Sequence, residues 1–204
     1  LVPIVWLQWA QRKKPCFVVV NHNSAARNGE PFKALIIAKK TTPNALRRFC
    51  TEELKVRCII EYTQSLKWKN WLNVVGLRYD EGHRVLKALG RNDEENRPFQ
   101  TVMPISRDVL EFWKTQQFDL GLQPWEGNCD LCFLKPQKTL REMIRNAPAM
   151  AEWWIEIERD WGRFRKEFSV FDLLENTNKQ PMFASIIDEE YDAECGMHCG
   201  NNEN

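Results

Sequence analysis

The sequence predicts an α/β protein, with a parallel sheet in the first part of the chain and a mostly helical C-terminal part. Two observations lead to this fold class. Apolar runs of strand length alternate with helical patterns over residues 1–125, and such alternation is typical of parallel sheets. Residues 126–204 contain helical patterns only. We therefore predict two parts, 1–125 and 126–204, separated by a change of class rather than by a flexible linker.

The first four predicted elements are two strands and two helices. Residues 2–8 and 16–22 are short runs rich in β-branched and aromatic side chains, and each is long enough for one buried strand. Residues 31–40 begin with a proline, which suits the first position of a helix. Residues 51–66 form an amphipathic helix. One face of that helix carries Leu54, Cys58, Ile59, Tyr62 and Leu66.

The later elements continue this order before the chain becomes helical. Residues 71–79 are the clearest strand, and the charged, turn-rich residues 90–98 predict a loop. A strand at 101–106 then precedes a helix at 106–118. Three further helices are predicted at 137–147, 148–164 and 170–176.

Composition excludes several classes of protein. Hydrophobic residues make up 43% of the 204, an ordinary share for a globular domain, and no apolar run approaches the roughly 18 residues of a membrane helix. The seven cysteines stand in a chain without an export signal, which predicts reduced thiols in a cytoplasmic protein. Because the chain starts at Leu1 rather than at a methionine, we expect a fragment or a protein that lacks its front.

Charge is divided unevenly along the chain. Residues 1–91 hold 17 Lys and Arg against 6 Asp and Glu, a net charge of +11, whereas residues 92–204 hold 12 against 22, a net charge of −10. We therefore expect any anion-binding site in the first half. Nucleic acid stays open as one such anion, although the basic residues are spread over several elements. The simpler alternative is a solvated surface with uneven charge.

Five cations stand in loops or helix starts around the predicted strands, where parallel sheets bind their ligands. Arginine presents a planar fork of donors to oxyanions such as phosphate or sulfate, and lysine adds a point charge. For any one of these residues alone, a surface salt bridge is the simpler alternative. The candidate anion-binding residues are Arg27, Arg48, Lys55, Arg78 and Arg84.

The spacing of the cysteines indicates metal or redox chemistry rather than a disulfide framework. Cys129 and Cys132 form a C-x2-C pair, and a C-x3-C pair around His198 consists of Cys195 and Cys199. A tetrahedral zinc site made of these four cysteines, with His198 as a substitute ligand, is one interpretation. Core packing is the prediction for two others, Cys16 and Cys58.

A set of segments carries a resemblance through nearly the whole chain. The segments are, in order, RNGEPF, PNALRRFCTEELK, VVGLRYDEGHR, FDLGL and GNCDLCFLK, followed by the tail ECGMHCG. They resemble the phosphoadenosine phosphosulfate (PAPS) reductase family, in particular bacterial and phage-type members of its adenine nucleotide α-hydrolase fold. The resemblance implies a Rossmann-like nucleotide-binding core over residues 1–125. It also implies an N-terminally incomplete core, because the family's Ser-Gly-Gly-type pyrophosphate loop has no counterpart here.

The tail implies the chemistry, because it is similar to the Glu-Cys-Gly-x-His-x-Gly ending of sulfonucleotide reductases. By this resemblance Cys195 attacks the sulfur of a bound adenylylated sulfate, and His198 helps to form the thiolate. A thioredoxin-like reductant then releases sulfite from the S-sulfocysteine. The five cations named above would hold the oxyanions of the adenine nucleotide.

The resemblance further implies an iron–sulfur cluster of the 4Fe-4S type, which usually takes four thiolates. Family members with this cluster use cysteines at positions that match Cys50, Cys129 and Cys132. They supply an adjacent Cys-Cys pair where this chain has a single cysteine, so the fourth ligand must come from elsewhere. We expect Cys199 to be that ligand. If Cys195 is the ligand instead, it cannot also be the free nucleophile.

Two other functions stay open beside the reductase. The first is an ATP-pyrophosphatase-type enzyme of the same fold that acts in sulfur transfer or nucleic-acid modification. It predicts AMP and pyrophosphate from ATP, and no sulfite. The second is a non-catalytic binding module stabilised by a metal, which predicts tightly bound zinc and no affinity for nucleotides. Catalysis by this chain alone depends on the front of the fold being supplied.

Overall fold

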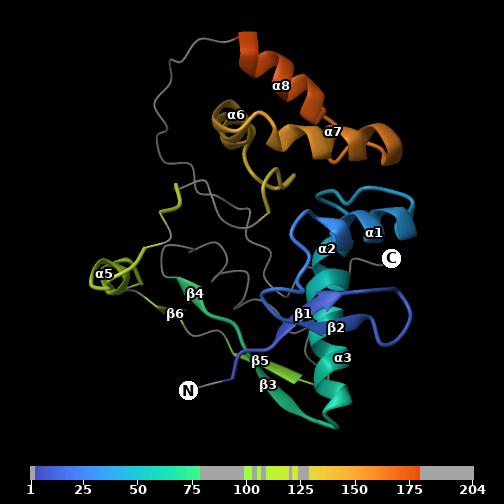
Figure 1. Ribbon diagram of the computed structural model, residues 1–204, viewed down its shortest axis with the longest axis vertical. Coiled ribbons are helices and arrows are strands. Elements are labelled where there is room, and N and C mark those ends of the chain that lie inside the picture. Colours follow the sequence, from blue (N-terminus) through green and yellow to red (C-terminus); the bar gives the residue numbers. More distant parts are fainter. Residues whose placement is uncertain are drawn as a thin grey trace. The chain divides into compact units, whose positions relative to one another are not determined.

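The computed structural model describes residues 3–78, 99–102, 105–106, 109–119, 121–123 and 129–179 (Figure 1). The chain divides into two compact units. The first unit comprises residues 1–62 and 123–204, and the second comprises residues 63–122. The first unit is therefore discontinuous in sequence. It contains elements from both sides of the boundary that we predict near residue 125.

A β-hairpin opens the first unit. It consists of β1 (Trp6–Trp9) and β2 (Phe17–Val20), which confirm the first two predicted strands. The two strands pair antiparallel, however, and so are not neighbours in a parallel sheet. The reason is the short connection, residues 10–16, because a parallel crossover needs a dozen residues or more. A hydrogen bond of 2.7 Å from the Ala10 N–H to the Cys16 carbonyl closes this connection.

Two helical segments follow the hairpin, as the sequence predicts. The first is α1 (Glu30–Lys39). The second is continuous and consists of α2 (Phe49–Thr51), the π-helix η1 (Glu52–Arg57) and α3 (Cys58–Ser65). The sequence pattern did not reveal the π-helical winding, which inserts extra backbone into a helix and is frequent at functional sites.

Three helices complete the described part of the first unit: α6 (Gln137–Asn146), α7 (Met150–Trp161) and α8 (Val170–Lys179). They confirm the three helices predicted for this part of the chain. The loop between α7 and α8 is fixed by the Glu158 carboxylate. It accepts the N–H of Phe164 at 3.1 Å and that of Val170 at 2.7 Å.

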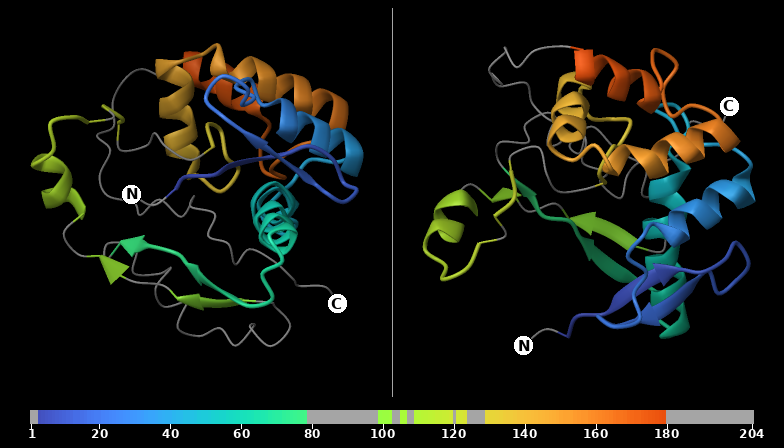
Figure 2. Two further views of the ribbon diagram at one scale, coloured as in Figure 1. Left: turned by 60° about the horizontal axis from the view of Figure 1, so that its bottom comes forward. Right: turned by 45° about the horizontal axis from the view of Figure 1, so that its top comes forward.

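The main core of the first unit joins α1 to the C-terminal helices. Ile36 of α1 and Ile157 of α7 are both buried in one apolar cluster. Phe32 stacks on Trp153, with ring centroids 5.7 Å apart, and Figure 2 shows α1 beside α7. This approach requires glycine before α1. Gly29 has a φ of +79°, and a Cβ there would lie 3.3 Å from the Trp153 ring.

The second unit holds two pairs of parallel strands. β3 (Trp71–Val74) pairs with β5 (Phe99–Val102), and β4 (Leu77–Arg78) pairs with β6 (Ile105–Ser106). A helix, α5 (Val109–Lys114), follows and is shorter than predicted. Each sheet in the described residues contains two strands. The complete nucleotide-binding sheet therefore stays a prediction.

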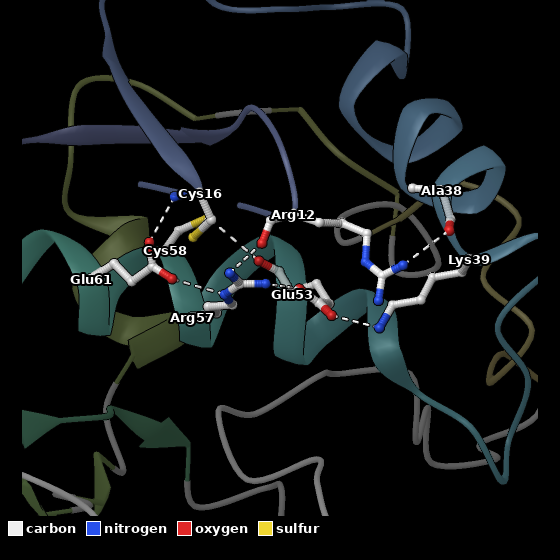
Figure 3. Close-up of polar contacts among 8 residues, drawn as sticks. All are labelled: Arg12, Cys16, Ala38, Lys39, Glu53, Arg57, Cys58 and Glu61. Atoms are coloured by element: carbon white, nitrogen blue, oxygen red, sulfur yellow. Dashed lines mark hydrogen bonds and ion pairs between the residues drawn. The ribbon is translucent and has the colours of Figure 1, made fainter. Parts of the chain in front are cut away.

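A polar network centred on Arg57 connects the hairpin to the helical segment (Figure 3). The Arg57 guanidinium donates to the carboxylates of Glu53 and Glu61, each at 2.9 Å. It also donates to the backbone carbonyl of Arg12 in the hairpin connection. Glu61 in turn accepts the Cys16 N–H at 2.7 Å. The hairpin is thus attached to the helix by polar contacts at both ends of its connection.

The network keeps both carboxylates ionised. Burial raises the pKa of Glu61. The Cys16 N–H and Arg57 together lower this pKa by more than burial raises it, so that it lies below the ordinary 4.5. Burial likewise raises the pKa of Glu53, and Lys39 and Arg57 outweigh it, so this pKa is also lowered. The Lys39 ammonium lies 2.6 Å from Glu53. Each carboxylate therefore stabilises the fold only while it is charged.

Replacing Arg57 by methionine should lower the free energy of unfolding by about 2–4 kcal/mol, because the largely buried Glu61 loses its cation and Glu53 keeps only Lys39. Urea denaturation followed by circular dichroism measures this change. Arg159→Met is the matched control, since Arg159 forms an exposed pair with Asp160 at 2.8 Å and should cost less than about 0.5 kcal/mol. Equal losses in the two variants would contradict the role that we assign to Arg57.

Stability should also fall with acid. Because the pKa values of Glu53 and Glu61 are lower in the folded chain, their contribution is complete above about pH 5 and is lost as the pH falls through the folded values. Glu61→Gln removes one of the two contributions. It should be less stable than the wild type at pH 7 and lose less stability between about pH 5 and pH 3. Urea titrations at several pH values test this, and parallel pH profiles would refute it.

Candidate functional site

Three of the predicted cluster ligands line one cavity in the first unit. The cavity has a volume of about 120 Å³, and its surface is almost wholly apolar. Cys50 comes from the helical segment, whereas Cys129 and Cys132 come from the turn that precedes α6. The other lining residues are Phe32, Thr51, Leu54, Lys55, Phe133 and Trp154.

Four residues on two successive turns of the helical segment line this cavity. Cys50 and Thr51 lie in α2, and Leu54 and Lys55 lie one turn later in η1. Thr51 is buried, Cys50 is half-buried, and Lys55 is exposed. The segment therefore places a thiol and an ammonium group on the same side of one helix.

The C-x2-C turn is held from two sides. The Lys135 N–H donates to the Cys132 carbonyl at 3.0 Å, which closes a turn over residues 132–135 directly after the motif. The Arg165 guanidinium donates to the Phe133 carbonyl at 2.6 Å. As a result Cys132 is buried, with 5% of its surface exposed, whereas Cys129 is exposed.

The three cysteines of the cavity fit the requirements of zinc and of an iron–sulfur cluster to different degrees. Among the residues that the structure describes, no three His, Cys, Asp or Glu side chains lie close enough together to hold one metal ion. Zinc requires such closeness, since tetrahedral Zn–S bonds of about 2.3 Å place the sulfurs about 3.8 Å apart. In a four-iron cluster each thiolate binds a different iron, so the sulfurs stand farther apart. Three cysteines around an apolar cavity fit a cluster in donor type. The other predicted residues of this chemistry, Cys195, His198 and Cys199, lie outside the described residues.

The predicted anion-binding residues are only partly brought together. Lys55 lines the cysteine cavity, and Arg48 immediately precedes the helical segment that carries Cys50. Arg27 is exposed, is not among the lining residues, and donates to the carbonyl of His22. Arg78 belongs to β4 in the second unit, and Arg84 lies outside the described residues.

Sequence reasoning missed Lys135. Only 3% of this lysine is exposed, and its ammonium nitrogen lies 3.3 Å from the sulfur of Met143. Burial of a cation is costly and favours anionic groups nearby. The signal that could have pointed to it is the C-x2-C-x2-K spacing from Cys129 to Lys135.

Two further cysteines form a separate pair, Cys16 and Cys58. Their sulfur atoms lie 3.8 Å apart in a second apolar cluster, and both side chains are buried. Burial raises the pKa of Cys16, and it raises the pKa of Cys58 to about 12, with the neighbouring Cys16 adding to the second shift. Both thiols are therefore protonated at neutral pH. This confirms the predicted core role of Cys16 and Cys58.

Comparisons with known proteins give one informative match. The chain is 31% identical over 102 residues to the "Uncharacterized nin region protein ORF290" of Escherichia phage lambda. The match covers 49% of this chain and 33% of that protein, so the chain spans about a third of its relative. No protein-family model and no solved structure matches the chain. Among the described helices, none has the length and apolar character needed to span a membrane.

The two groups of cysteines should differ in reactivity. In metal-free folded protein, Cys129 should react with a maleimide well before Cys16 and Cys58, because it is exposed whereas the pair is buried and protonated. Mass spectrometry of the labelled peptides measures the order of reaction. In urea the pair should label readily. If Cys58 is labelled as fast as Cys129 in the folded protein, the prediction is wrong.

Proposed function

We propose that the protein is a PAPS reductase-like enzyme that reduces an adenylylated sulfate to sulfite with a cysteine thiol and carries a 4Fe-4S cluster. The observation that carries the proposal is the cavity shared by Cys50, Cys129 and Cys132. Two distant parts of the sequence supply these three residues. Packing alone does not require cysteine at all three positions, whereas ligation of a cluster does.

The surroundings of the cavity support an anionic group at this position. A cluster with four thiolates carries net negative charge, and an adenylylated sulfate is also an anion. Lys55 stands at the cavity, and Lys135 is buried in the adjoining turn. Both cations offset negative charge in a site whose walls are apolar.

The fourth ligand would link the cluster to the reactive thiol. Cys199 is our candidate for this ligand, and the candidate nucleophile Cys195 precedes it by four residues. Ligation of Cys199 would hold Cys195 near Lys55, because four residues span at most about 14 Å. Proximity of the thiol to the substrate anion is what the reaction needs.

The proposed reaction has two steps. The Cys195 thiolate, whose proton passes to His198, attacks the sulfur of the sulfate group. A sulfur–sulfur bond forms, the bond from that sulfur to the phosphate oxygen breaks, and the adenine nucleotide leaves. One thiol of a thioredoxin-like dithiol then attacks the Cys195 sulfur and displaces sulfite. The second thiol closes the disulfide of the reductant and restores Cys195.

Protein purified without oxygen should contain about four irons and four inorganic sulfides per chain and absorb broadly in the visible range. Cys132→Ala and Cys199→Ser should lose most of this iron. Cys58→Ala is the matched control, because it removes a buried thiol outside the cavity and should keep the iron. Iron analysis and the visible spectrum are the measurements. One zinc per chain in a colourless protein would instead favour the metal-stabilised binding module.

The same preparations separate the reductase from its relatives in the fold class. With adenosine 5′-phosphosulfate or its 3′-phosphorylated form and a dithiol, the reductase should release sulfite. Cys195→Ser should keep its iron and lose sulfite release. Hydrolysis of ATP to AMP and pyrophosphate without any sulfite would favour the ATP-pyrophosphatase-type enzyme instead.

A further inference from the structure

Positive charge gathers in one stretch of the first unit and is only partly balanced there. Residues 10–48 contain nine Lys and Arg and a single carboxylate, Glu30. Glu30 serves the start of its own helix, because it accepts the Asn28 N–H at 2.9 Å. The balance of this stretch therefore depends on carboxylates from other elements.

Those carboxylates reach only some of the cations. Lys33 pairs with Glu156 at 2.7 Å, and Lys39 pairs with Glu53 at 2.6 Å. Glu53 also pairs with Arg57, so its single negative charge is shared between two cations. Among the described residues of this stretch, Arg12 and Arg27 are exposed and donate to backbone carbonyls, whereas four other exposed cations form neither an ion pair nor a side-chain hydrogen bond. They are Lys13, Lys14, Lys40 and Arg47, which we call the basic track.

The first three residues of the basic track lie on adjoining segments. Lys13 and Lys14 stand in the hairpin connection next to Arg12. The Arg12 guanidinium donates to the Ala38 carbonyl at 3.3 Å, in the last turn of α1 (Figure 3). Lys40 follows α1 directly, in a left-handed conformation with a φ of 56°. These contacts hold the hairpin connection against the C-terminal end of α1.

The basic track continues toward the cysteine cavity. The loop after Lys40 is anchored at Thr42, whose hydroxyl donates to the Arg163 carbonyl at 2.9 Å. A turn closed by hydrogen bonds between Asn44 and Arg47 follows, and it leads within three residues to Cys50. Lys40 and Arg47 therefore stand on a loop that is anchored at Thr42 and ends at the candidate site.

We propose that the basic track binds the phosphate backbone of a nucleic acid. Unpaired Lys and Arg side chains along a surface are the electrostatic footprint of such binding, since each can replace a counterion of one phosphate. A single nucleotide in the cavity would not need four cations on two segments outside it. The inference does not depend on the reductase, and it predicts contacts with phosphates rather than with bases.

The salt dependence of binding is the test. Four phosphate contacts predict that the logarithm of the binding constant falls with the logarithm of salt concentration with a slope of about −3 to −4. The combined variant Lys13→Gln, Lys14→Gln, Lys40→Gln should leave a slope of about −1 and bind at least tenfold more weakly at 100 mM KCl. Fluorescence anisotropy with labelled 30-nucleotide single strands of DNA and RNA, and with a 30-base-pair duplex, measures both quantities.

A matched variant controls for the loss of charge. Lys67→Gln, Lys69→Gln, Lys166→Gln removes the same three charges from exposed positions outside the basic track, and it should bind like the wild type. Equal weakening in both triple variants would overturn the proposal, as would absence of wild-type binding at 50 mM KCl. Binding to phosphatidylserine vesicles that nucleic acid fails to compete away would overturn it too, in favour of a membrane surface. Iron content is measured on every variant, so a failed cluster and a failed basic track give different results.

Discussion

The position of the Arg57 guanidinium fixes the hairpin against the helical segment that carries the candidate site. It is shared between two carboxylates of its own helix and a carbonyl of the hairpin connection. The same helical segment turns Cys50 and Lys55 toward the cavity, while Arg57 and Glu61 contact the hairpin. The rotation of this segment about its axis is therefore set on one side by charge pairing, and the candidate site is positioned on the other side as a consequence.

The cysteines illustrate how surroundings divide one residue type into two roles. Cys16 and Cys58 lie against apolar side chains and the Glu61 carboxylate, and both influences favour the neutral thiol. Cys50 and Cys132 instead line a cavity together with Lys55. Metal ligation and nucleophilic attack both require the thiolate. The buried pair of Cys16 and Cys58, which is protonated at neutral pH, is therefore unsuited to either role.

Local patterns predicted the elements better than their pairing. The β-branched runs around β1 and β2 and the periodicity of α6, α7 and α8 were sufficient to find these elements. Strand patterns carry no information on direction, so the predicted parallel arrangement was wrong for β1 and β2, whose short connection makes them antiparallel. Contacts between α1 and α7, such as Phe32 on Trp153, join residues too distant in sequence for any local pattern to reveal. Lys135 escaped notice because lysine is almost never buried in proteins.

The candidate site, too, could be predicted only in part from the sequence. The structure brings Cys50 beside the C-x2-C turn, a grouping that only the family resemblance had suggested, since cysteine spacing alone left zinc and cluster sets open. The ligand set itself stays a prediction. The charge imbalance along the chain predicts an anion-binding site in the first half, and this site stays a prediction. The imbalance could not separate the cations that the fold neutralises, such as Lys39, from those that it leaves in water, such as Lys13 and Lys14.

The discontinuity of the first unit also has a bearing on biosynthesis. Phe32 and Ile36 leave the ribosome long before Trp153 and Ile157, the side chains that cover them. At ordinary translation rates of 5–20 residues per second, the intervening 120 or so residues take on the order of ten seconds to appear. During that interval α1 exposes an apolar face without its cover. Burial of this face therefore has to wait until the C-terminal helices have been synthesised.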